Sequence, residues 1–447
     1  MTESIPTSPS IPSSPEIVIE KPTTIKVVDE KLPGKQDKYL WAIYIALIFF
    51  SLIELYSASS REITAGRIFF PLIRHAVLLG IGTIIVFTLS RIKFRRFYDF
   101  IPWFVLGSII LMVYVLFKGD IINGARRSVT IMGFSLYPSE FLKLSAVLVI
   151  ALLMSKTHLK KNHNPNSCVI ATAGVVLFMG GLLFTQGLTN TLLLMAISLS
   201  MMIVGGIKWS KLLLVIVCYI VVAGAGYLYK EMSAQNREEA AGVAVEKVDG
   251  KQPLSRWETW VARFNRHFDD TPKYTQPVTS KNQQEMYSYM AQANGGVLGK
   301  MPGNSREASR LPLAFSDYIF AIIVEDLGLI GGIFVMFLYL SLIARAGSVA
   351  ARCSSALPAM LVMGCAVMII LQALFHMAIV TGVFPVSGQP LPLISKGGTS
   401  IIITSIAFGI MLSISRFAVQ SGKKQEAKEE TNSLPEDFRA ANPTQLT

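Results

Sequence analysis

The sequence predicts an all-α, polytopic integral membrane protein with about ten transmembrane helices and a large extracytoplasmic loop between helices 7 and 8. The first observation behind this prediction is the composition. Only 16% of the 447 residues are charged and 52% are hydrophobic, whereas about 25% of a soluble domain is charged. The second is the recurrence of apolar runs of about 20 residues, the length of a helix that crosses a bilayer. Together they exclude a water-soluble enzyme and a disordered chain.

The ten predicted helices follow these apolar runs along the chain. Their ranges are 39–58, 69–90, 100–117, 139–155, 165–184, 188–206, 211–229, 316–344, 356–381 and 398–415. The stretch 164–207 contains no Asp, Glu, Lys or Arg and is long enough for two helices. The charge-free stretch 353–395 is predicted to hold one helix and then a segment, 382–398, that is too rich in Gly and Pro to be helical.

The positions of lysine and arginine predict the orientation in the membrane. Basic residues follow the second, fourth, sixth and eighth helices, as Arg91, Lys156 and Lys208 illustrate. Because basic loops stay in the cytoplasm, both termini are expected there. The formal charge of +12 is assigned to such loops, and no nucleic-acid partner is predicted.

The predicted domain organisation has three parts. Residues 1–38, which lack a signal peptide, are expected to form a disordered cytoplasmic tail, and residues 417–447 a second one. Residues 39–416 form the membrane domain, with its outer loop at 230–315. Aromatic and basic residues alternate within this loop between Trp257 and Phe268, which is typical of an amphipathic segment at the membrane interface.

Ionisable residues inside the predicted helices are candidates for function, because burying them in a membrane is costly. Glu54 and His376 are expected to be hydrogen-bonded core residues. Glu140 and Lys143 are spaced i, i+3, so the two could pair, either for structure alone or for function. Glu325 and the adjacent Asp326 are expected to find structural partners.

The candidate site lies where two irregular segments, 295–315 and 385–400, are predicted to frame one outward cavity. Asp317 opens the eighth helix, where it could cap the helix or act as a general base with a raised pKa. The glycine-rich stretch 295–305 could bring backbone N–H groups close to an anion, but it lacks the spacing of a Walker loop. The segment 385–400 is irregular, and irregular backbone at membrane depth must be buried in protein or line a wet cavity.

Five ordered pieces of sequence resemble the SEDS family (shape, elongation, division and sporulation), over residues 39–416. They are Asn123–Arg127, Pro138–Lys143, the set Gln284, Ser288, Ala291 and Gly295-Gly296, the block from Asn304-Ser305 to Asp317 with Glu325–Gly328, and Pro385–Ser400. The chain departs from the family pattern at Ser128, at Gly187–Thr191, which lacks the family's acidic residue, and at Tyr287, Phe315 and Lys396.

The resemblance implies a peptidoglycan glycosyltransferase that polymerises lipid II, with Asp317 as the general base. The implied substrate-binding residues are Arg126, Arg127, Glu140, Lys143, Gln284, Ser288, Lys300, Asn304, Ser305 and Lys396. A divalent cation could assist, although the sequence shows no cluster of metal ligands and no C-x-x-C pair among its four cysteines.

The resemblance also implies a place in the bacterial cytoplasmic membrane and a class B penicillin-binding protein as partner. The long polar tails and the Pro138–Lys143 piece favour a division member like FtsW, at the septum with other divisome proteins. An elongation polymerase like RodA is the alternative within the family. A transporter that flips lipid II and a scaffold that only recruits a transpeptidase are the rival classes.

Overall fold

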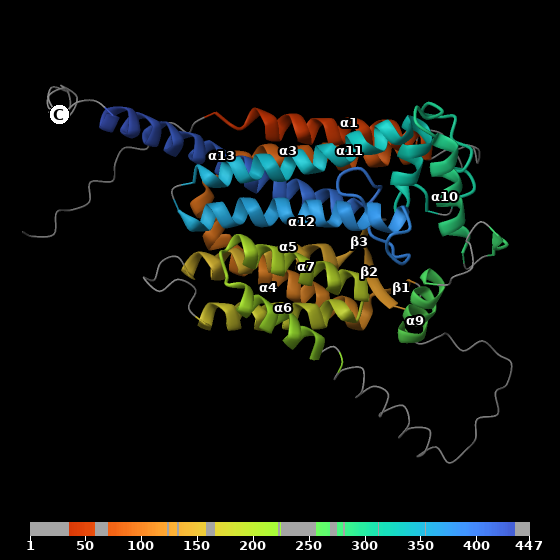
Figure 1. Cartoon of the computed structure of the whole chain (residues 1–447), viewed down its shortest axis with the longest axis horizontal. Coiled ribbons are helices and arrows are strands. Elements are labelled where there is room, and N and C mark those ends of the chain that lie inside the picture. The colour runs from red at the N-terminus through yellow and green to blue at the C-terminus, as the bar shows by residue number, and fades with distance from the viewer. Residues whose placement is uncertain are drawn as a thin grey trace, which may run out of the picture. The chain divides into compact units, whose positions relative to one another are not determined.

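The computed structural model describes residues 35–433, except 59–69, 123–124, 132–133, 158–165, 222–223, 225–255, 269–274, 280–281, 312 and 354. Most of this part of the chain is helical (Figure 1). In chain order the elements are α1 (Lys38–Ala58), α3 (Phe70–Arg91), α4 (Phe94–Lys118), β1 (Asp120–Ile122), β2 (Ala125–Ile131), β3 (Phe134–Leu136), α5 (Pro138–Thr157), α6 (Asn166–Phe184), α7 (Leu188–Val204), an unlabelled helix Trp209–Val221, α9 (Arg256–His267), α10 (Gln283–Gly295), α11 (Ile319–Ala351), α12 (Ala356–Val380) and α13 (Gly398–Ser433).

Seven described helices are long and apolar enough to cross a membrane: α3, α4, α5, α6, α11, α12 and the first part of α13. The chain is therefore a polytopic membrane protein, as predicted. α7 and the helix Trp209–Val221 are apolar but shorter. The total of ten spans stays a prediction.

The bundle has a buried centre and an apolar periphery. Between 72% and 83% of the span residues in α5, α12 and α13 are buried, against 22–33% in α3, α4, α6 and α11. The outer helices expose large apolar side chains, such as Phe117 on α4 and Phe337 on α11. Such side chains face the lipid hydrocarbon in a bilayer without cost. The three central helices, in contrast, form the buried frame that positions the polar groups.

Three short strands depart from the all-α prediction. β1, β2 and β3 form an antiparallel sheet in that order, between α4 and α5. Ile122 pairs with Ala125, so only Asn123 and Gly124 separate the first two strands. Asn-Gly between two short strands is a strong signal for a hairpin. We expected a plain outer loop here, because the stretch lies between two predicted helices.

Two helices also differ from their predicted ends. α13 continues to Ser433, where a polar tail was expected from residue 417. Its last residues are rich in Lys, Glu, Gln and Ala, which favour a helix without any apolar face. Within α11, the backbone is not helical at Gly328, where φ is +71° and ψ is −175°.

The break in α11 is filled by the glycine-rich loop that follows α10. The N–H groups of Lys300 and Met301 donate to the carbonyl oxygens of Glu325 and Asp326 at 3.0 and 2.8 Å. In the other direction, the N–H of Leu329 donates to the carbonyl oxygen of Gly296 at 2.9 Å. The loop thus supplies the partners that the interrupted helix lacks.

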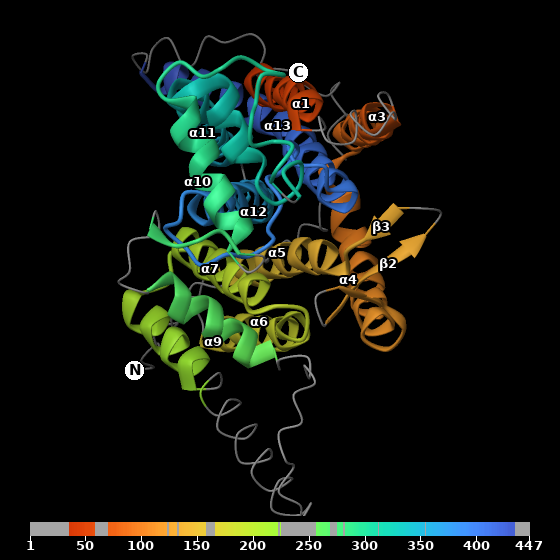
Figure 2. The ribbon, with the colours of Figure 1, turned by 90° about the vertical axis from the view of Figure 1, so that its right-hand side faces the viewer.

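The ends of the bundle differ in content. α9, α10 and the strands lie at one end, together with the start of α11 (Figures 1 and 2). The start of α1 and the polar extension of α13 lie at the other end (Figure 1). The residues predicted to form the site gather at the first of these ends.

Because α10 approaches α11 closely at Gly295, a side chain at this position is expected to destabilise the fold. A Cβ on this residue would lie 1.9 Å from the carbonyl oxygen of Val324. Gly295→Ala should therefore lower the free energy of unfolding by about 1–3 kcal/mol through overpacking. Gly347→Ala in α11, where no atom lies within 4 Å of the added Cβ, is the control and should be neutral or slightly stabilising. Thermal unfolding in detergent measures both, and equal melting temperatures would contradict the prediction.

Candidate active site

Asp317 lies just before α11 and directly against the irregular segment 385–397. The N–H of Lys396 donates to the carbonyl oxygen of Phe315 at 2.9 Å, and the Ser395 hydroxyl donates to that of Ser316 at 2.6 Å. A Cβ on Gly388 would lie 2.7 Å from Asp317 Oδ2, so a larger residue at this position would displace the carboxylate. The end of the predicted segment 295–315 therefore meets the segment 385–400, next to Asp317.

Buried side chains of the surrounding helices hold the segment 385–397 in place through its carbonyl oxygens. The donors are His376 Nδ1 to Gln389 at 2.6 Å, Gln372 Nε2 to Pro390 at 3.3 Å, the Tyr339 hydroxyl to Pro392 at 2.6 Å and the Ser51 hydroxyl to Ile394 at 3.1 Å. This satisfies backbone that no helix pairs. His376 is a hydrogen-bonded core residue, as predicted.

The predicted ion pair between Glu140 and Lys143 is present in the first turns of α5. Lys143 is fully buried, and its Nζ donates to Glu140 Oε1 at 2.7 Å. It also donates to Gln372 Oε1 of α12 at 3.3 Å, while Gln372 Nε2 donates to Glu140 Oε2 at 3.4 Å. Because the same amide holds Pro390, this cluster links α5 and α12 to the segment beside Asp317.

The electrostatic surroundings of Asp317 are set by burial and by nearby cations. Burial raises the pKa of this carboxyl group above its ordinary value, while a hydrogen bond with Ser316 and the charge of Arg127 lower it by less. Arg127 stands on β2, is half-buried and has a buried Nε without a hydrogen-bond partner in the described structure. A partly desolvated carboxylate beside a guanidinium can accept a proton next to bound anionic substrate.

A second arginine reaches the same place from α9. Arg263 Nη1 donates to the carbonyl oxygen of Val386 at 3.0 Å, and its charge lies close enough to Arg127 to lower that residue's pKa. Burial is the larger cause of the lowered pKa of both guanidinium groups. Two like charges held together in this way favour an anion between or beside them.

The remaining predicted cations lie at different distances from this centre. The Lys396 ammonium stands 4.4 Å from the centre of the Phe315 ring, within the site. Arg126 is exposed and donates to the carbonyl oxygens of Leu116 and Phe117 at the end of α4. Its contact with a helix C-terminus gives a reason for a basic residue on the side predicted to face outward.

Several predicted binding residues belong to the junction of α10 with α11 and α12 instead. The Ser305 hydroxyl donates to Glu325 Oε2, and Asn304 Nδ2 donates to the carbonyl oxygen of Lys300 at 3.1 Å. The Ser288 hydroxyl donates to the carbonyl oxygen of Val380 at 2.9 Å. Gln284 is half-buried on α10.

Comparison with known proteins places this geometry in a family. A model of the cell cycle protein family FtsW/RodA/SpoVE matches residues 37–420. The chain belongs to this family. A relative in Geobacter metallireducens, named a probable peptidoglycan glycosyltransferase FtsW, is 25% identical over 393 residues, which are 85% of this chain and 95% of the relative.

Two solved structures share the fold of this family member. A chain from a structure titled as the coordination of polymerization and crosslinking by a peptidoglycan synthase complex matches with a TM-score of 0.64 and 22% identity, over 86% of this chain and 99% of that one. The rod shape determining protein RodA of Thermus thermophilus matches with a TM-score of 0.58 and 21% identity, over 85% and 97% of the two chains.

Sequence reasoning missed three residues that build the site. Gln372 is the one amide in a helix whose only other strongly polar side chain is His376, which was a usable signal of a buried polar contact. Arg263 was noted only as part of the amphipathic segment, since nothing in the sequence connects it with residue 386. Gly388 was one of several glycines, and its contact with Asp317 depends on the tertiary fold.

The deep carboxylates of α1 and α11 have unlike surroundings. Glu325 has the expected partners, Ser305 and the N–H groups of Arg306 and Glu307 at 3.0 and 3.3 Å. Glu54 is fully buried, and no group in the described part of the chain donates a hydrogen bond to it, contrary to the prediction. Asp326 lies near the Ser57 hydroxyl, outside hydrogen-bonding geometry.

Among the described residues, no group of three or more His, Cys, Asp or Glu side chains is placed to hold a metal ion.

The buried ion pair gives a prediction about stability. Lys143→Met should lower the free energy of unfolding by about 3–5 kcal/mol, because it leaves the Glu140 carboxylate buried without its cation. The double variant Glu140→Gln with Lys143→Met should recover most of this loss, since no buried charge remains. Lys156→Met, at the exposed end of the same helix, is the control. If single and double variants melt alike in detergent, the pair does not stabilise the bundle in this way.

Proposed function

We propose that this chain is a peptidoglycan glycosyltransferase that polymerises lipid II, with Asp317 as its general base. One observation carries the proposal: a partly buried carboxylate with a raised pKa stands against glycine, beside two arginines, at the end of a membrane bundle. The printed names of the curated relatives supply the reaction class.

The reaction is a glycosyl transfer in which side chains of this protein accept one proton and stabilise one leaving anion. The 4-hydroxyl of the incoming GlcNAc attacks the anomeric carbon of a lipid-linked MurNAc, and Asp317 accepts the hydroxyl proton as the new C–O bond forms. The bond from that carbon to the undecaprenyl pyrophosphate breaks, and the pyrophosphate leaves with the bonding electrons. Arg127, Arg263 and Lys396 stand where cationic side chains can stabilise this anion.

The position of the site favours an enzyme over a transporter that flips lipid II. Transporters bind substrate near the middle of the membrane, between discontinuous helices. Here Asp317 precedes α11, Arg127 stands on β2 and Arg263 on α9, so the three lie at the end of the bundle that holds the strands and α9 (Figure 1). The central helices below them are the most buried of the bundle, which suits a rigid support.

The proposed setting is the bacterial division septum. Several curated relatives are named FtsW, and this favours a division role over elongation by a RodA-like enzyme. A class B penicillin-binding protein and divisome proteins are the proposed partners, since the new glycan must be cross-linked. With both termini in the cytoplasm, as the basic loops indicate, the site faces outward, where lipid II is used.

Replacing the proposed base tests the assignment directly. Asp317→Asn keeps the shape of the side chain but cannot accept a proton at neutral pH, so polymerisation of lipid II should fall about 10²–10⁴-fold. Asp120→Asn, at an exposed position of β1, makes the same chemical change and should polymerise normally. Glycan strands are measured by gel electrophoresis after reconstitution. Near-normal strand formation by Asp317→Asn at equal protein level would refute the role.

The pH dependence of the rate tests the electrostatics around the base. Asp317 is active when deprotonated, so log kcat/KM should rise with pH through its raised pKa and then level off. Because the charge of Arg127 lowers that pKa, Arg127→Gln should move the acidic limb to higher pH. Arg126→Gln, whose guanidinium is turned to the end of α4, should leave the position of the limb unchanged. If the acidic limb of the Arg127→Gln variant lies at the same pH as in the wild type, the charge of Arg127 does not act on Asp317.

A further inference from the structure

The junction of α6 with α7, residues 185–191, lies against the irregular segment beside the proposed base. The Ser387 hydroxyl donates to the Thr189 hydroxyl at 2.8 Å, and Gln389 Nε2 donates to Asn190 Oδ1 at 3.0 Å. The glycine between Ser387 and Gln389 lies against the carboxylate of the proposed base. The α6–α7 junction is therefore joined by hydrogen bonds to one wall of the candidate active site.

Two glutamines at this contact are buried, and each keeps one amide atom that no group in the described part of the chain pairs. Gln186, which follows α6, is 2% exposed, and its Nε2 has no hydrogen-bond acceptor. Gln389 is 4% exposed, and its Oε1 has no donor although its Nε2 is paired. A buried polar atom without a partner costs about 1–3 kcal/mol, and such atoms are uncommon in folded proteins. These two amides therefore point to a polar ligand.

Arg127 of β2 borders the same junction. A Cβ on Gly187 would lie 3.9 Å from Arg127 Nη2. The buried Nε of Arg127 also lacks a partner among the described residues. The charge of Arg127 acts on Asp317 as well. This arginine is therefore close both to the α6–α7 junction and to the proposed base.

The three unpaired atoms differ in what they can bind. Arg127 Nε and Gln186 Nε2 can only donate a hydrogen bond, and Gln389 Oε1 can only accept one. A phosphate oxyanion only accepts, so it would satisfy the two donors and leave the oxygen of Gln389 unpaired. An amide or a hydroxyl group both donates and accepts, and it can satisfy all three. The α6–α7 junction itself contains no Asp, Glu, Lys or Arg, which also favours a neutral ligand.

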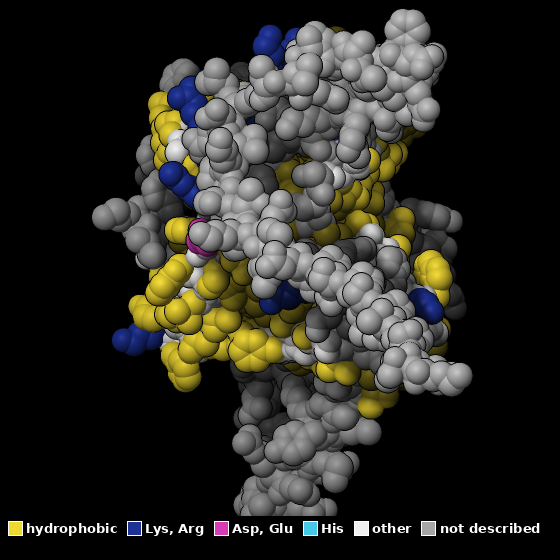
Figure 3. All heavy atoms as spheres, turned by 90° about the vertical axis from the view of Figure 1, so that its left-hand side faces the viewer, with side chains coloured by type: hydrophobic (Ala, Val, Ile, Leu, Met, Phe, Trp, Pro, Cys, Tyr) yellow, Lys and Arg dark blue, Asp and Glu magenta, His cyan; other side chains and the backbone are white. Residues whose placement is uncertain are grey.

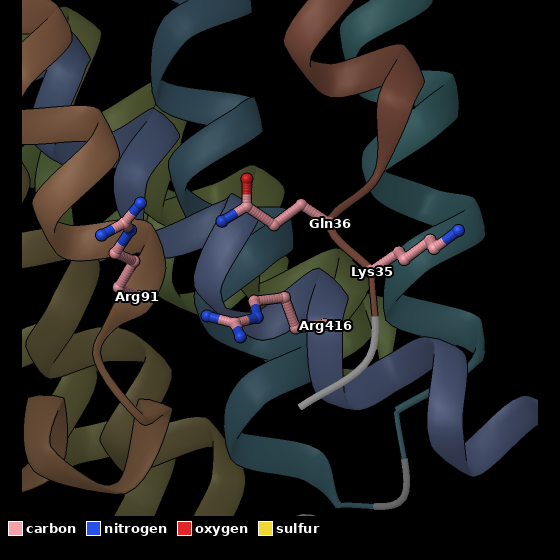
Figure 4. Close-up of a pocket in the computed structure, with 4 residues that line it drawn as sticks. All are labelled: Lys35, Gln36, Arg91 and Arg416. Atoms are coloured by element: carbon pink, nitrogen blue, oxygen red, sulfur yellow. The ribbon is translucent and has the colours of Figure 1, made fainter. Parts of the chain in front are cut away.

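Other glutamines of the chain have both ends of their amides paired. At the opposite end of the bundle, Lys and Arg side chains stand among hydrophobic surface (Figure 3). A hollow at that end is lined by Lys35, Gln36, Arg91 and Arg416 (Figure 4). Gln36 Nε2 donates to the Ser90 hydroxyl at 3.0 Å, and its Oε1 accepts from Trp41 Nε1 at 2.6 Å. Gln372, buried in α12, is also paired at both amide atoms. The unpaired amides of Gln186 and Gln389 are thus particular to the wall beside the proposed base.

We propose that Gln186, Gln389 and Arg127 form a subsite at the α6–α7 junction for the acetamido group of an N-acetylamino sugar. The oxygen of the acetamido group accepts from Gln186 Nε2 and Arg127 Nε, and its N–H donates to Gln389 Oε1. This inference rests on the proposed function, because it assigns one sugar of the lipid-linked substrate to this wall of the site. A guanidinium has five N–H donors, so Arg127 can bind the sugar and still act on the leaving pyrophosphate.

The experiment measures binding to the full chain in detergent by native mass spectrometry, with three lipids. They are lipid II, the same lipid-linked disaccharide without its peptide, and undecaprenyl pyrophosphate without sugar. Gln389→Leu and Gln186→Leu should each weaken binding of the first two lipids about tenfold and leave binding of undecaprenyl pyrophosphate unchanged. Gln283→Leu makes the same chemical change at a half-buried position of α10 and should bind all three lipids like the wild type.

Polymerisation kinetics and thermal unfolding add readouts that a purely structural role would not give. Loss of a sugar contact made in both the ground state and the transition state should raise KM about tenfold and change kcat little, whereas replacing the base lowers kcat. Gln186→Leu removes an amide whose Nε2 is unpaired, so its melting temperature without ligand should equal or exceed that of the wild type. This variant keeps the test decisive if Gln389→Leu, which also loses the bond to Asn190, unfolds.

The outcomes separate the subsite from the proposed function. Unchanged binding of lipid II by both leucine variants would overturn the subsite, as would an equal loss for all three lipids. A loss confined to the lipid that carries the peptide would assign the junction to the peptide and also overturn the proposal. A wild-type chain that binds none of the three lipids would refute the proposed function, and the subsite with it.

Discussion

The cluster of Lys143, Glu140 and Gln372 is the constraint on which the site depends. A buried ammonium is tolerated only where its hydrogen bonds are nearly all satisfied, and here one carboxylate and one amide do so across two helices. That requirement fixes the relative depth of α5 and α12. Because Gln372 also holds the carbonyl oxygen of Pro390, the same cluster fixes the height of the segment that carries Gly388.

The rest of the site follows from the need to pair backbone groups that no regular helix pairs. Side chains of α1, α11 and α12 donate hydrogen bonds to successive carbonyl oxygens of the segment 385–397. The N–H of Lys396 in this segment donates to the carbonyl oxygen of Phe315, two residues before Asp317. The carboxylate is thus placed by a continuous set of hydrogen bonds to rigid helices, while the arginines approach it from β2 and α9. Such support suits a group that must be held in one position while it accepts a proton.

Much of the fold was readable from the sequence because membrane helices are encoded locally. A run of about 20 apolar residues needs no long-range partner to be recognised, and an i, i+3 ion pair such as Glu140–Lys143 lies on one helical face. The meeting of the segments near 317 and 388 was also predictable, since both are irregular. The contacts of Gln372 and Arg263 were not, because their partners lie far along the chain or in another element. The strands were missed although Asn123-Gly124 signalled them, and the length of α13 was missed because its end has no apolar pattern.

The break at Gly328 divides α11 into a short outer helix and a longer inner helix. The nine residues from Ile319 to Leu327 are joined by hydrogen bonds to the loop after α10, rather than continued smoothly into the rest of the helix. Val297, Leu298 and Met301 of that loop are 62%, 78% and 68% exposed, so the loop presents apolar side chains on the surface. Paired backbone joins this loop to the short outer helix, and Asp317 lies two residues before the start of that helix. The position of Asp317 therefore depends in part on a loop whose own side chains lie on the surface.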